Sequence, residues 1–236
     1  MNIAILTAGG IGTRTHQDIP KQFFNVDNKP VLVYTMEAFQ NHPSIDEICV
    51  VILEGWEKIL WAYAKQFNIT KLKYVTVGGT TGQESIFNGL KTIRACNSDD
   101  TVVMIHDGNR PLVGAEVITD SLVKQNKYGS AVATIPCTEV VLISENGIYS
   151  DKTIPREHLY RTQTPHSYYL GEIWQAHIQA QEMGIVNTAA SCSLMLQLGK
   201  KSVFSKGSEK NLKITTLEDL EIFEALLKSE KSAWVK

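Results

Sequence analysis

The chain has 236 residues, of which 43% are hydrophobic and 20% charged, and its formal net charge is -2. Proteins that bind nucleic acids are usually strongly basic, so this charge balance argues against nucleic acid as the main partner. No apolar run reaches the roughly 20 residues that cross a bilayer as a helix, which argues against a membrane partner. The apolar residues 1–6 lack the basic segment of a secretory signal, so a cytoplasmic location is expected.

Short apolar runs alternate along the chain with segments whose apolar residues recur at the helical period. This alternation is typical of βαβ units and predicts an α/β fold with a mostly parallel sheet flanked by helices. Strands are expected at residues 2–6, 47–53, 72–77, 101–105 and 130–135. Helices are expected at residues 30–40, 83–96 and 115–127, and a last one runs to Leu227 after Thr215 and Glu218, which have the spacing of a capping box.

The segment from Thr138 to Tyr160 departs from this alternation because it has no helical period. An apolar run at 140–143 and a second segment at 148–154 flank the turn signal Glu145-Asn146-Gly147, which predicts a β-hairpin. A two-stranded arm is marginally stable alone in water, so we expect it to pack on another surface, plausibly a second subunit. The length of the chain fits a single domain, residues 1–236, with a β-arm at approximately 137–160.

The four cysteines, Cys49, Cys96, Cys137 and Cys192, lie far apart and form no CxxC pair. This usage is typical of reduced thiols in a protein core. Zinc ligands or a disulfide framework would call for closer, paired spacing, so neither is expected.

The first predicted strand runs directly into a glycine-rich loop. Gly9, Gly10 and Gly12 fall within four positions, and Arg14 and Lys21 follow. Glycines let backbone N–H groups approach an anionic ligand, and the two cations can neutralise a triphosphate. The loop matches neither the dinucleotide fingerprint nor the GK[ST] of a P-loop. A plain tight turn would explain the glycines but not the cations, so we interpret the loop as nucleotide-binding.

A second polar motif, residues 106–111, follows the strand that we expect at the centre of the sheet. Ligands of open α/β sheets gather at this edge, where Asp107 could hold a magnesium ion and Arg110 could bind a phosphate. The alternative is a surface loop with an ordinary Asp–Arg pair. His106 is assigned to packing or hydrogen bonding beside the site, because metal-ligand spacing is missing. The segments 161–166 and 211–215 are weaker signals, although Lys213 could also reach a phosphate.

Together these motifs resemble those of the methylerythritol-phosphate and ribitol-phosphate cytidylyltransferases, in the family's order and over nearly the whole chain. The resemblance implies a Rossmann-like nucleotidyltransferase fold, CTP as the donor, Mg²⁺ as the cofactor, and a homodimer whose β-arms reach across to the partner. The matching blocks are residues 8–14 (AGGIGTR), 20–23 (PKQF), 106–111 (HDGNRP), 162–165 (TQTP) and 211–215 (NLKIT).

The resemblance also implies roles for individual residues, carried over position by position. The catalytic cations would be Arg14 and Lys21, on the triphosphate, and Lys213, beside the acceptor. Asp107 would hold the metal. The nucleotide pocket would be lined by Ala8, Gly9, Gly10, Gly12, Gly79 and Ser85, and the acceptor would be bound by Arg110, Thr164 and the partner subunit's Arg156.

Several positions depart from the family pattern, and most of them lie where the family contacts the acceptor. Gly82 stands where an arginine is usual, Val140 where a threonine is common, and Ala189-Ala190 near an expected acid. We therefore expect the acceptor to be a polyol phosphate other than methylerythritol phosphate, with ribitol 5-phosphate as the first choice. Methylerythritol 4-phosphate, glycerol phosphate and another pentitol phosphate remain alternatives, and the pathway (isoprenoid, teichoic acid or capsule) follows from the acceptor.

Two readings from other classes also remain open. The same departures would suit a nucleotide-binding sensor that has lost catalysis, although such a protein would not need a metal-held transition state. The glycine-rich opening is shared with sugar-1-phosphate and molybdopterin nucleotidyltransferases, but the Thr164-Pro165 block and the arm favour the cytidylyl branch.

Overall fold

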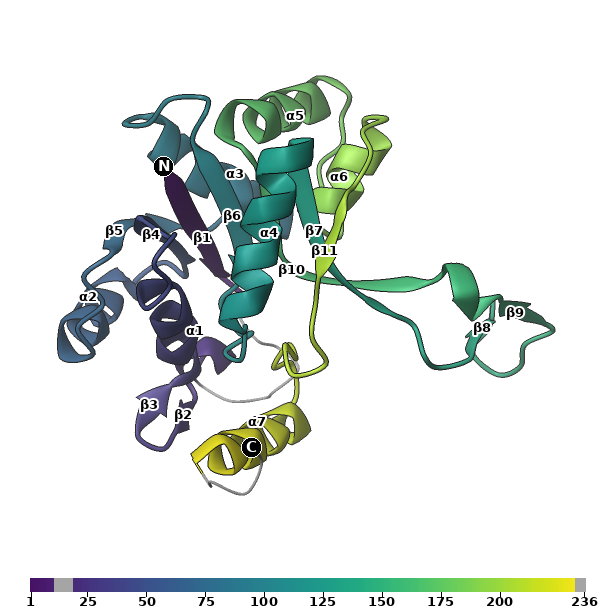
Figure 1. Cartoon of the computed structure of the whole chain (residues 1–236), viewed down its shortest axis with the longest axis horizontal. Coiled ribbons are helices and arrows are strands. Elements are labelled where there is room, and N and C mark those ends of the chain that lie inside the picture. Colours follow the sequence, from purple (N-terminus) through teal and green to yellow (C-terminus); the bar gives the residue numbers. More distant parts are fainter. Residues whose placement is uncertain (11–18, 232–236) are drawn as a thin grey trace.

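A seven-stranded sheet runs through the middle of the computed structural model, which describes residues 1–10 and 19–231 (Figure 1). All neighbouring strands are parallel except β10, which runs antiparallel to both β6 and β7. The predicted mostly parallel sheet is therefore confirmed. In sheet order, the strands are β11 (Phe204–Lys206), β7 (Ser130–Pro136), β10 (Tyr160–Tyr169), β6 (Val102–Asp107), β1 (Asn2–Ala8), β4 (Glu47–Ile52) and β5 (Leu72–Val77).

Helices cover both faces of the sheet, because the alternating side chains of its inner strands make both faces apolar. In β1, Ala4 and Leu6 are buried in one core cluster, whereas Ile3 and Ile5 are buried in the other. The first cluster is covered by α1 (Val31–Gln40), α2 (Glu57–Gln66) and α4 (Ala115–Tyr128), and the second by α3 (Gly82–Arg94), α5 (Leu170–Glu182) and α6 (Ser191–Gln197).

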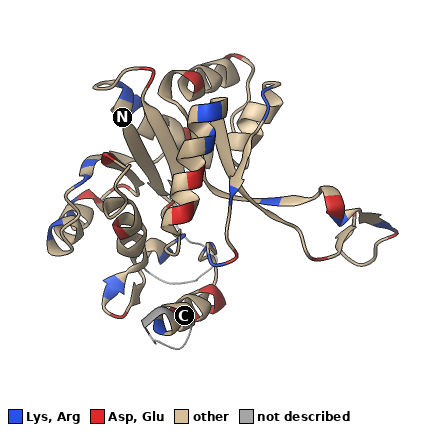
Figure 2. Ribbon diagram, viewed as in Figure 1, with Lys and Arg blue, Asp and Glu red and all other residues tan. Residues whose placement is uncertain are grey.

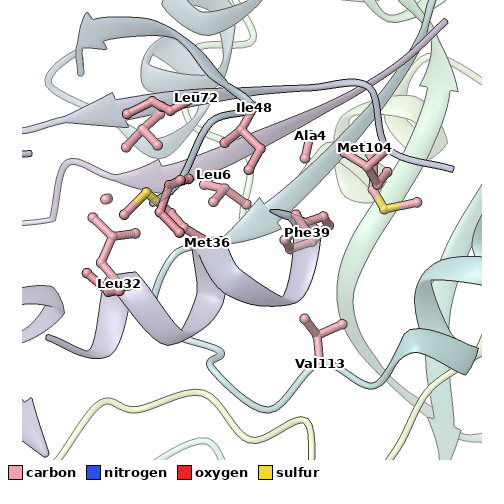
Figure 3. Close-up of a cluster of buried hydrophobic side chains, with 14 of the residues drawn as sticks. Ala4, Leu6, Leu32, Met36, Phe39, Ile48, Leu72, Met104 and Val113 are labelled. Carbon is pink, nitrogen blue, oxygen red and sulfur yellow. The ribbon is translucent and has the colours of Figure 1, made fainter. Parts of the chain in front are cut away.

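Helix α1 illustrates how a face is built (Figure 3). Leu32, Met36 and Phe39 recur at spacings of four and three residues, so they share one side of the helix. All three are fully buried, and they belong to the same cluster as Ile48 of β4 and Met104 of β6. The helix is thereby fixed across the strands that carry the polar motifs.

The strand order reverses at β1. The chain passes from β1 to β4 and β5 on one side, and then places β6 on the other side of β1. Helix α1, which leads to β4, and helix α3, which leads to β6, pack on opposite faces of the sheet. Ligands of open α/β sheets bind beyond the carboxyl ends of the strands at such a reversal. In this chain that place lies beyond Ala8 and Asp107.

The predicted hairpin is present and projects away from the body of the molecule (Figure 1). Its strands β8 (Val141–Ile143) and β9 (Lys152–Ile154) pair antiparallel, and the turn between them uses Gly147 at a φ of 71°. Ile148 and Tyr149 at its tip are 85% and 73% exposed. The arm therefore presents apolar side chains that the described part of the same chain does not cover.

Strand β10 was not predicted, and neither were α2, α5, α6 and β11. The first half of β10 carries polar residues, yet Gln163 is buried, and from His166 onward the strand is enclosed between β6 and β7. Because hydrophobic periodicity was the signal used, a polar strand buried by its neighbours escapes it. Pro30 is also corrected: it belongs to β3 (Lys29–Pro30), which pairs with β2 (Asn25–Val26), and α1 begins only at Val31.

The cap of the last helix, α7 (Leu217–Lys231), lies one residue further along the chain than predicted. The predicted pair was Thr215 with Glu218. In the structure Thr216 Oγ1 accepts from the backbone N–H of Asp219, at 3.2 Å. The Asp219 carboxylate in turn accepts from the N–H groups of Thr215 and Thr216, at 2.7 and 2.8 Å. The capping box is therefore formed by Thr216 and Asp219.

Charges of both signs are interspersed along the ribbon rather than gathered by element (Figure 2). The arm, for example, carries Lys152 and Arg156 together with Asp151 and Glu157. None of the described helices is both long and apolar enough to cross a membrane.

The capping geometry makes a prediction about stability. We expect Asp219→Ala to lower the free energy of unfolding by about 1 kcal/mol, because it removes a helix cap. The matched control Glu218→Ala removes an exposed neighbouring acid that makes no cap contact, and its effect should stay within about 0.5 kcal/mol. Urea unfolding followed by circular dichroism measures both. A larger loss of stability for Glu218→Ala than for Asp219→Ala would mean that Thr215 and Glu218 form the cap, as the sequence predicted.

Candidate active site

A cavity of about 490 Å³ opens at the carboxyl ends of β1 and β6, where the strand order reverses. Its wall combines segments that lie far apart in the sequence: the loop after β1, the loop before α3, the end of β6, the middle of β10, residues 188–191, and the stretch before α7. The predicted site residues that line it are Ala8, Gly9, Gly10, Lys21, Gly79, Ser85, Asp107, Arg110, Thr164 and Lys213.

The remaining site predictions fall elsewhere. Gly12 and Arg14 lie outside the described residues. Arg156 does not line this cavity: it belongs to the short helix η3 (Arg156–His158) on the arm, and its Nη1 donates to the carbonyl of Thr138 at 3.1 Å.

Gln22 fixes the loop that follows β1. It lies in the short helix η2 (Lys21–Phe23) and is 2% exposed. Its Nε2 donates to the carbonyls of Ala8 and Gly10, at 2.6 and 3.3 Å. Because these bonds hold the carbonyls on either side of Gly9, the loop is tied to the same short helix that carries Lys21 into the cavity wall.

The loop before α3 is held by Ser85. The hydroxyl of Ser85 accepts from the N–H of Gly79 at 3.0 Å and donates to the carbonyl of Thr81 at 2.9 Å. Its single proton is thus already used within the protein. Gly79 has no room for a side chain, because a Cβ there would lie 2.3 Å from Cγ of Glu84. Glycine is therefore required at position 79 by the close packing of the loop against Glu84.

Gln83 links the same loop to the opposite wall of the cavity. Its Nε2 donates to the carbonyl of Ile185 at 2.6 Å, and its Oε1 accepts from the N–H of Thr188 at 2.9 Å. Gln83 is 8% exposed. Its amide therefore positions the segment that carries Ala189 and Ala190 into the cavity lining.

Asp107 holds two of the site's cations at once. Its Oδ2 lies 2.9 Å from Nε of Arg110, and its Oδ1 lies 3.0 Å from Nζ of Lys213. Burial opposes ionisation of this carboxyl, whose side chain is 18% exposed. The positive charges of Lys213 and Arg110 outweigh that effect and hold the pKa of Asp107 well below its usual range. Asp107 is therefore ionised throughout the neutral range.

Two buried asparagines place Lys213 beside Asp107. The side chain of Asn109 donates to the carbonyl of Ile214, whose N–H returns a bond to the carbonyl of Asn109 at 2.9 Å. Asn211 donates from Nδ2 to the carbonyl of Thr164 at 2.8 Å, and its own carbonyl accepts from Arg110 at 2.7 Å. The segment before α7 is thus hydrogen-bonded on both sides of Lys213.

Sequence reasoning did not identify these positioning residues. Gln22, Gln83, Asn109 and Asn211 are neutral, and each acts through a partner that is defined only by the folded chain. Asn109 and Asn211 do lie inside blocks singled out for their charged members, and Gln22 directly follows Lys21. Their position next to charged motif residues was the one signal in the sequence that could have identified them.

The carboxylate content of the cavity bears on metal binding. Asp107 is the one carboxylate among the described residues that line the cavity. Across residues 1–10 and 19–231, no three His, Cys, Asp or Glu residues gather into a group that could hold an ion. Magnesium is often held by one or two carboxylates together with substrate phosphates. The donor set therefore fits an ion that binds together with a phosphorylated substrate, and does not fit a cage built from protein alone.

The family to which this chain belongs follows from comparison with known proteins. The family model for 2-C-methyl-D-erythritol 4-phosphate cytidylyltransferase matches residues 2–229. The chain belongs to this family. It is therefore a cytidylyltransferase that uses CTP. This finding argues against the catalytically inactive reading and against the sugar-1-phosphate and molybdopterin readings.

Individual relatives carry two different names. A ribitol-5-phosphate cytidylyltransferase of Lacticaseibacillus paracasei is 40% identical over 233 residues, which cover 98% of this chain and 100% of the relative. A 2-C-methyl-D-erythritol 4-phosphate cytidylyltransferase of Clostridium acetobutylicum is 37% identical, with 97% and 98% covered. The crystal structure of 4-diphosphocytidyl-2C-methyl-D-erythritol synthase from Anaerococcus prevotii superposes with a TM-score of 0.81 at 25% identity, covering 96% of each chain. The expected Rossmann-like nucleotidyltransferase fold is thereby confirmed.

Three buried histidines generate a prediction about pH. His106, His166 and His177 are at most 3% exposed, and burial lowers the pKa of each to about 4. In the unfolded chain their pKa is near the ordinary value of about 6.5. Between pH 6.5 and pH 4 these histidines are therefore protonated in the unfolded chain but remain neutral in the folded protein. Stability contributed by the neutral rings is therefore present above pH 6.5 and is lost as the pH falls toward 4.

His177 offers the cleanest variant, because its ring stacks on Phe87 with centroids 5.2 Å apart and its Nε2 has no hydrogen-bond partner in the described chain. We expect the melting temperature of His177→Phe to fall less between pH 7 and pH 5 than that of the parent. Parallel melting curves across this range would measure the difference. An unchanged pH dependence would mean that His177 does not resist protonation.

Proposed function

We propose that this enzyme transfers CMP from CTP to ribitol 5-phosphate, giving CDP-ribitol and pyrophosphate, with Mg²⁺ as cofactor. The observation that carries the proposal is the convergence of Lys21, Arg110 and Lys213 on one cavity with Asp107. Two anionic substrates must meet for this reaction, and a cavity lined by several cations can hold both.

The chemical step is an in-line attack of an acceptor phosphate oxygen on the α-phosphorus of CTP, with pyrophosphate leaving. A phosphate monoester has a second pKa of roughly 6, so it is largely dianionic at neutral pH and already nucleophilic. No general base is needed, which agrees with the lowered pKa, about 4, that makes His166 and His177 of the cavity weak bases. Catalysis then consists of positioning and of fixed positive charge.

The residues divide between the two substrates. Lys21 and the N–H groups of the loop at Gly9 and Gly10 bind the triphosphate and stabilise the departing pyrophosphate. Arg14, which lies seven positions before Lys21 in the sequence, is assigned to the same phosphates. Lys213 and Arg110 bind the acceptor phosphate. Cations that are already in place stabilise the negative charge that grows in the transition state, and the protein does not have to reorganise during the reaction.

The metal is assigned to the carboxylate of Asp107 together with phosphate oxygens of the substrates. When bound, Mg²⁺ supplies charge neutralisation between donor and acceptor phosphates. Arg110 and Lys213 contact the same carboxylate at 2.9 and 3.0 Å, so they would lie beside the metal.

The choice of ribitol 5-phosphate rests on the acceptor side of the cavity. Ala189 and Ala190, which stand near an acid expected in the family, line the cavity, and their small side chains leave room for a longer polyol. Relatives at 37% to 40% identity that bear the ribitol-5-phosphate cytidylyltransferase name support the same choice.

The active form is proposed to be a homodimer joined through the β-arms. Val140, Leu142, Ile148 and Tyr149 are 63% to 85% exposed on the arm, and such apolar exposure is stabilised by a partner surface. In the dimer the arm would bring Arg156 to the acceptor site of the other subunit. A closed twofold pair completes both sites in this way.

The proposed reaction is tested by pyrophosphate release from CTP with a panel of polyol phosphates. We expect the highest kcat/KM with ribitol 5-phosphate, lower values with glycerol phosphate and methylerythritol 4-phosphate, and loss of turnover when EDTA removes divalent ions. Best turnover with methylerythritol 4-phosphate would contradict the acceptor assignment. Release with none of the acceptors would contradict the function itself.

The shared site is tested by mixing two defective variants. Lys21→Ala should lose on the order of 10²–10³ in turnover, and Arg156→Ala should also be impaired. Random reassortment places one intact site in each heterodimer, so the mixture should recover about a quarter of the parent activity if arm and cavity come from different subunits. Lys58→Ala, an exposed lysine on α2, is the control and should remain fully active. No recovery on mixing would mean that Arg156 acts within its own chain or not at all.

A further inference from the structure

The hydroxyl of Thr164 occupies an unusual place in the cavity wall. Thr164 lies opposite Asp107 where the β6–β10 ladder would continue beyond its last pair, Ile105 with His166. The ladder stops there, and the N–H of Asp107 donates to Oγ1 of Thr164 at 3.0 Å instead of to a backbone carbonyl. The same oxygen lies 3.1 Å from Nδ1 of His106. The hydroxyl therefore already has two protein partners, and Thr164 is one of the residues that line the cavity.

The second partner of His106 fixes the direction of these bonds. Nε2 of His106 lies 3.2 Å from the carbonyl oxygen of Arg110. A carbonyl can only accept, so Nε2 must carry the hydrogen. A neutral imidazole then has a bare Nδ1, which can only accept, and at an assay pH of about 8 a histidine with an ordinary pKa is neutral. The proton of the Thr164 hydroxyl is therefore donated to His106.

The remaining capacity of Thr164 follows by counting. A hydroxyl has one proton and two acceptor lone pairs. The proton is committed to His106 and one lone pair to the N–H of Asp107, which leaves one lone pair for a ligand. A lone pair cannot bind an unprotonated phosphate oxygen, because both are acceptors, but it can accept a hydrogen bond from an alcohol. The bond from Asn211 to the carbonyl of Thr164, at 2.8 Å, holds the backbone in this position.

We propose that His106 is a positioning residue that orients the Thr164 hydroxyl as an acceptor, and that Thr164 thereby recognises a hydroxyl group of the polyol acceptor rather than its phosphate. This inference rests on the proposed function. The substrate hydroxyl is assigned to the acceptor and not to the nucleotide. The reason is that Thr164 is bonded to the N–H of Asp107, and the carboxylate of Asp107 holds Arg110 and Lys213, the two cations assigned to the acceptor.

The consequence concerns specificity. A site that bonds a substrate hydroxyl discriminates strongly against the analogue that lacks it, because its own polar group is then left unpaired. Contacts to the phosphate alone would not distinguish polyol phosphates from their deoxy analogues. Thr164 and His106 should therefore contribute to the choice among acceptors more than to the affinity for phosphate.

The test compares kcat/KM for the best polyol phosphate with kcat/KM for each of its monodeoxy analogues. With the parent enzyme, we expect one analogue to be poorer by tenfold or more. Thr164→Val, which keeps the shape but loses the oxygen, should reduce that ratio by about tenfold, while Thr164→Ser should keep it. The KM for CTP should change little in either variant.

Two variants of His106 separate orientation from simple structural support. His106→Leu frees the Thr164 proton and should lower the discrimination ratio as Thr164→Val does. His106→Asn places an amide oxygen near the position of Nδ1 and should restore the ratio, even if both variants melt at lower temperatures than the parent. Because the ratio compares two substrates on one enzyme, a partial loss of folded protein does not change it.

Three results would overturn the inference. An equal loss on all acceptors, deoxy analogues included, would mean that Thr164 binds the phosphate. A changed discrimination between CTP and its deoxyribose analogues would mean that the hydroxyl belongs to the nucleotide. An unchanged ratio in both Thr164→Val and His106→Leu would mean that neither residue reads a hydroxyl. Failure of the proposed function would look different, since the parent enzyme would then release no pyrophosphate in the same assay.

Discussion

The carboxylate of Asp107, shared between Arg110 and Lys213, is the interaction on which the organisation of the site depends. It joins the end of β6 to a segment more than 100 residues later in the chain, and it does so in the wall of the cavity. An unpaired charge in this partly buried position would be unfavourable, and two cations side by side would repel one another. One anion between them resolves both difficulties, so the cations are held in place before any substrate arrives.

The topology of the sheet makes this arrangement available. Because the strand order reverses at β1, Gly9 and Gly10 beyond β1 and Asp107 at the end of β6 line the same cavity. The antiparallel strand β10 then adds Thr164 to the wall, and the stretch before α7 adds Lys213. The hydrogen bonds of Gln22, Gln83, Asn109 and Asn211 fix these segments relative to one another. The chemistry is thus carried by charged groups, and the geometry by neutral amides.

How much of this could be predicted from the sequence depends on the range of the interactions involved. The glycine loop with Lys21, and the block around Asp107 and Arg110, are local signals. Of their described residues, Gly9, Gly10, Lys21, Asp107 and Arg110 do meet in one cavity. Strand β10 was missed because its polar residues give no hydrophobic pattern, and they are buried only because β6 and β7 enclose the strand. The cap of α7 was displaced by one residue because Thr215 and Thr216 offer equivalent hydroxyls, and only the fold selects between them. The role of His106 likewise depends on a carbonyl and a hydroxyl that the sequence does not bring together.

The central claim is that one cavity receives both anions, with the triphosphate on the glycine loop and Lys21 and the acceptor phosphate on Lys213 and Arg110. The most direct measurement is a crystal structure with ribitol 5-phosphate and a CTP analogue that cannot be cleaved between its α- and β-phosphates. The account predicts the α-phosphorus between these two groups of cations, with an acceptor phosphate oxygen in line for attack. A triphosphate bound away from Lys21, or an acceptor phosphate that contacts neither Lys213 nor Arg110, would contradict it.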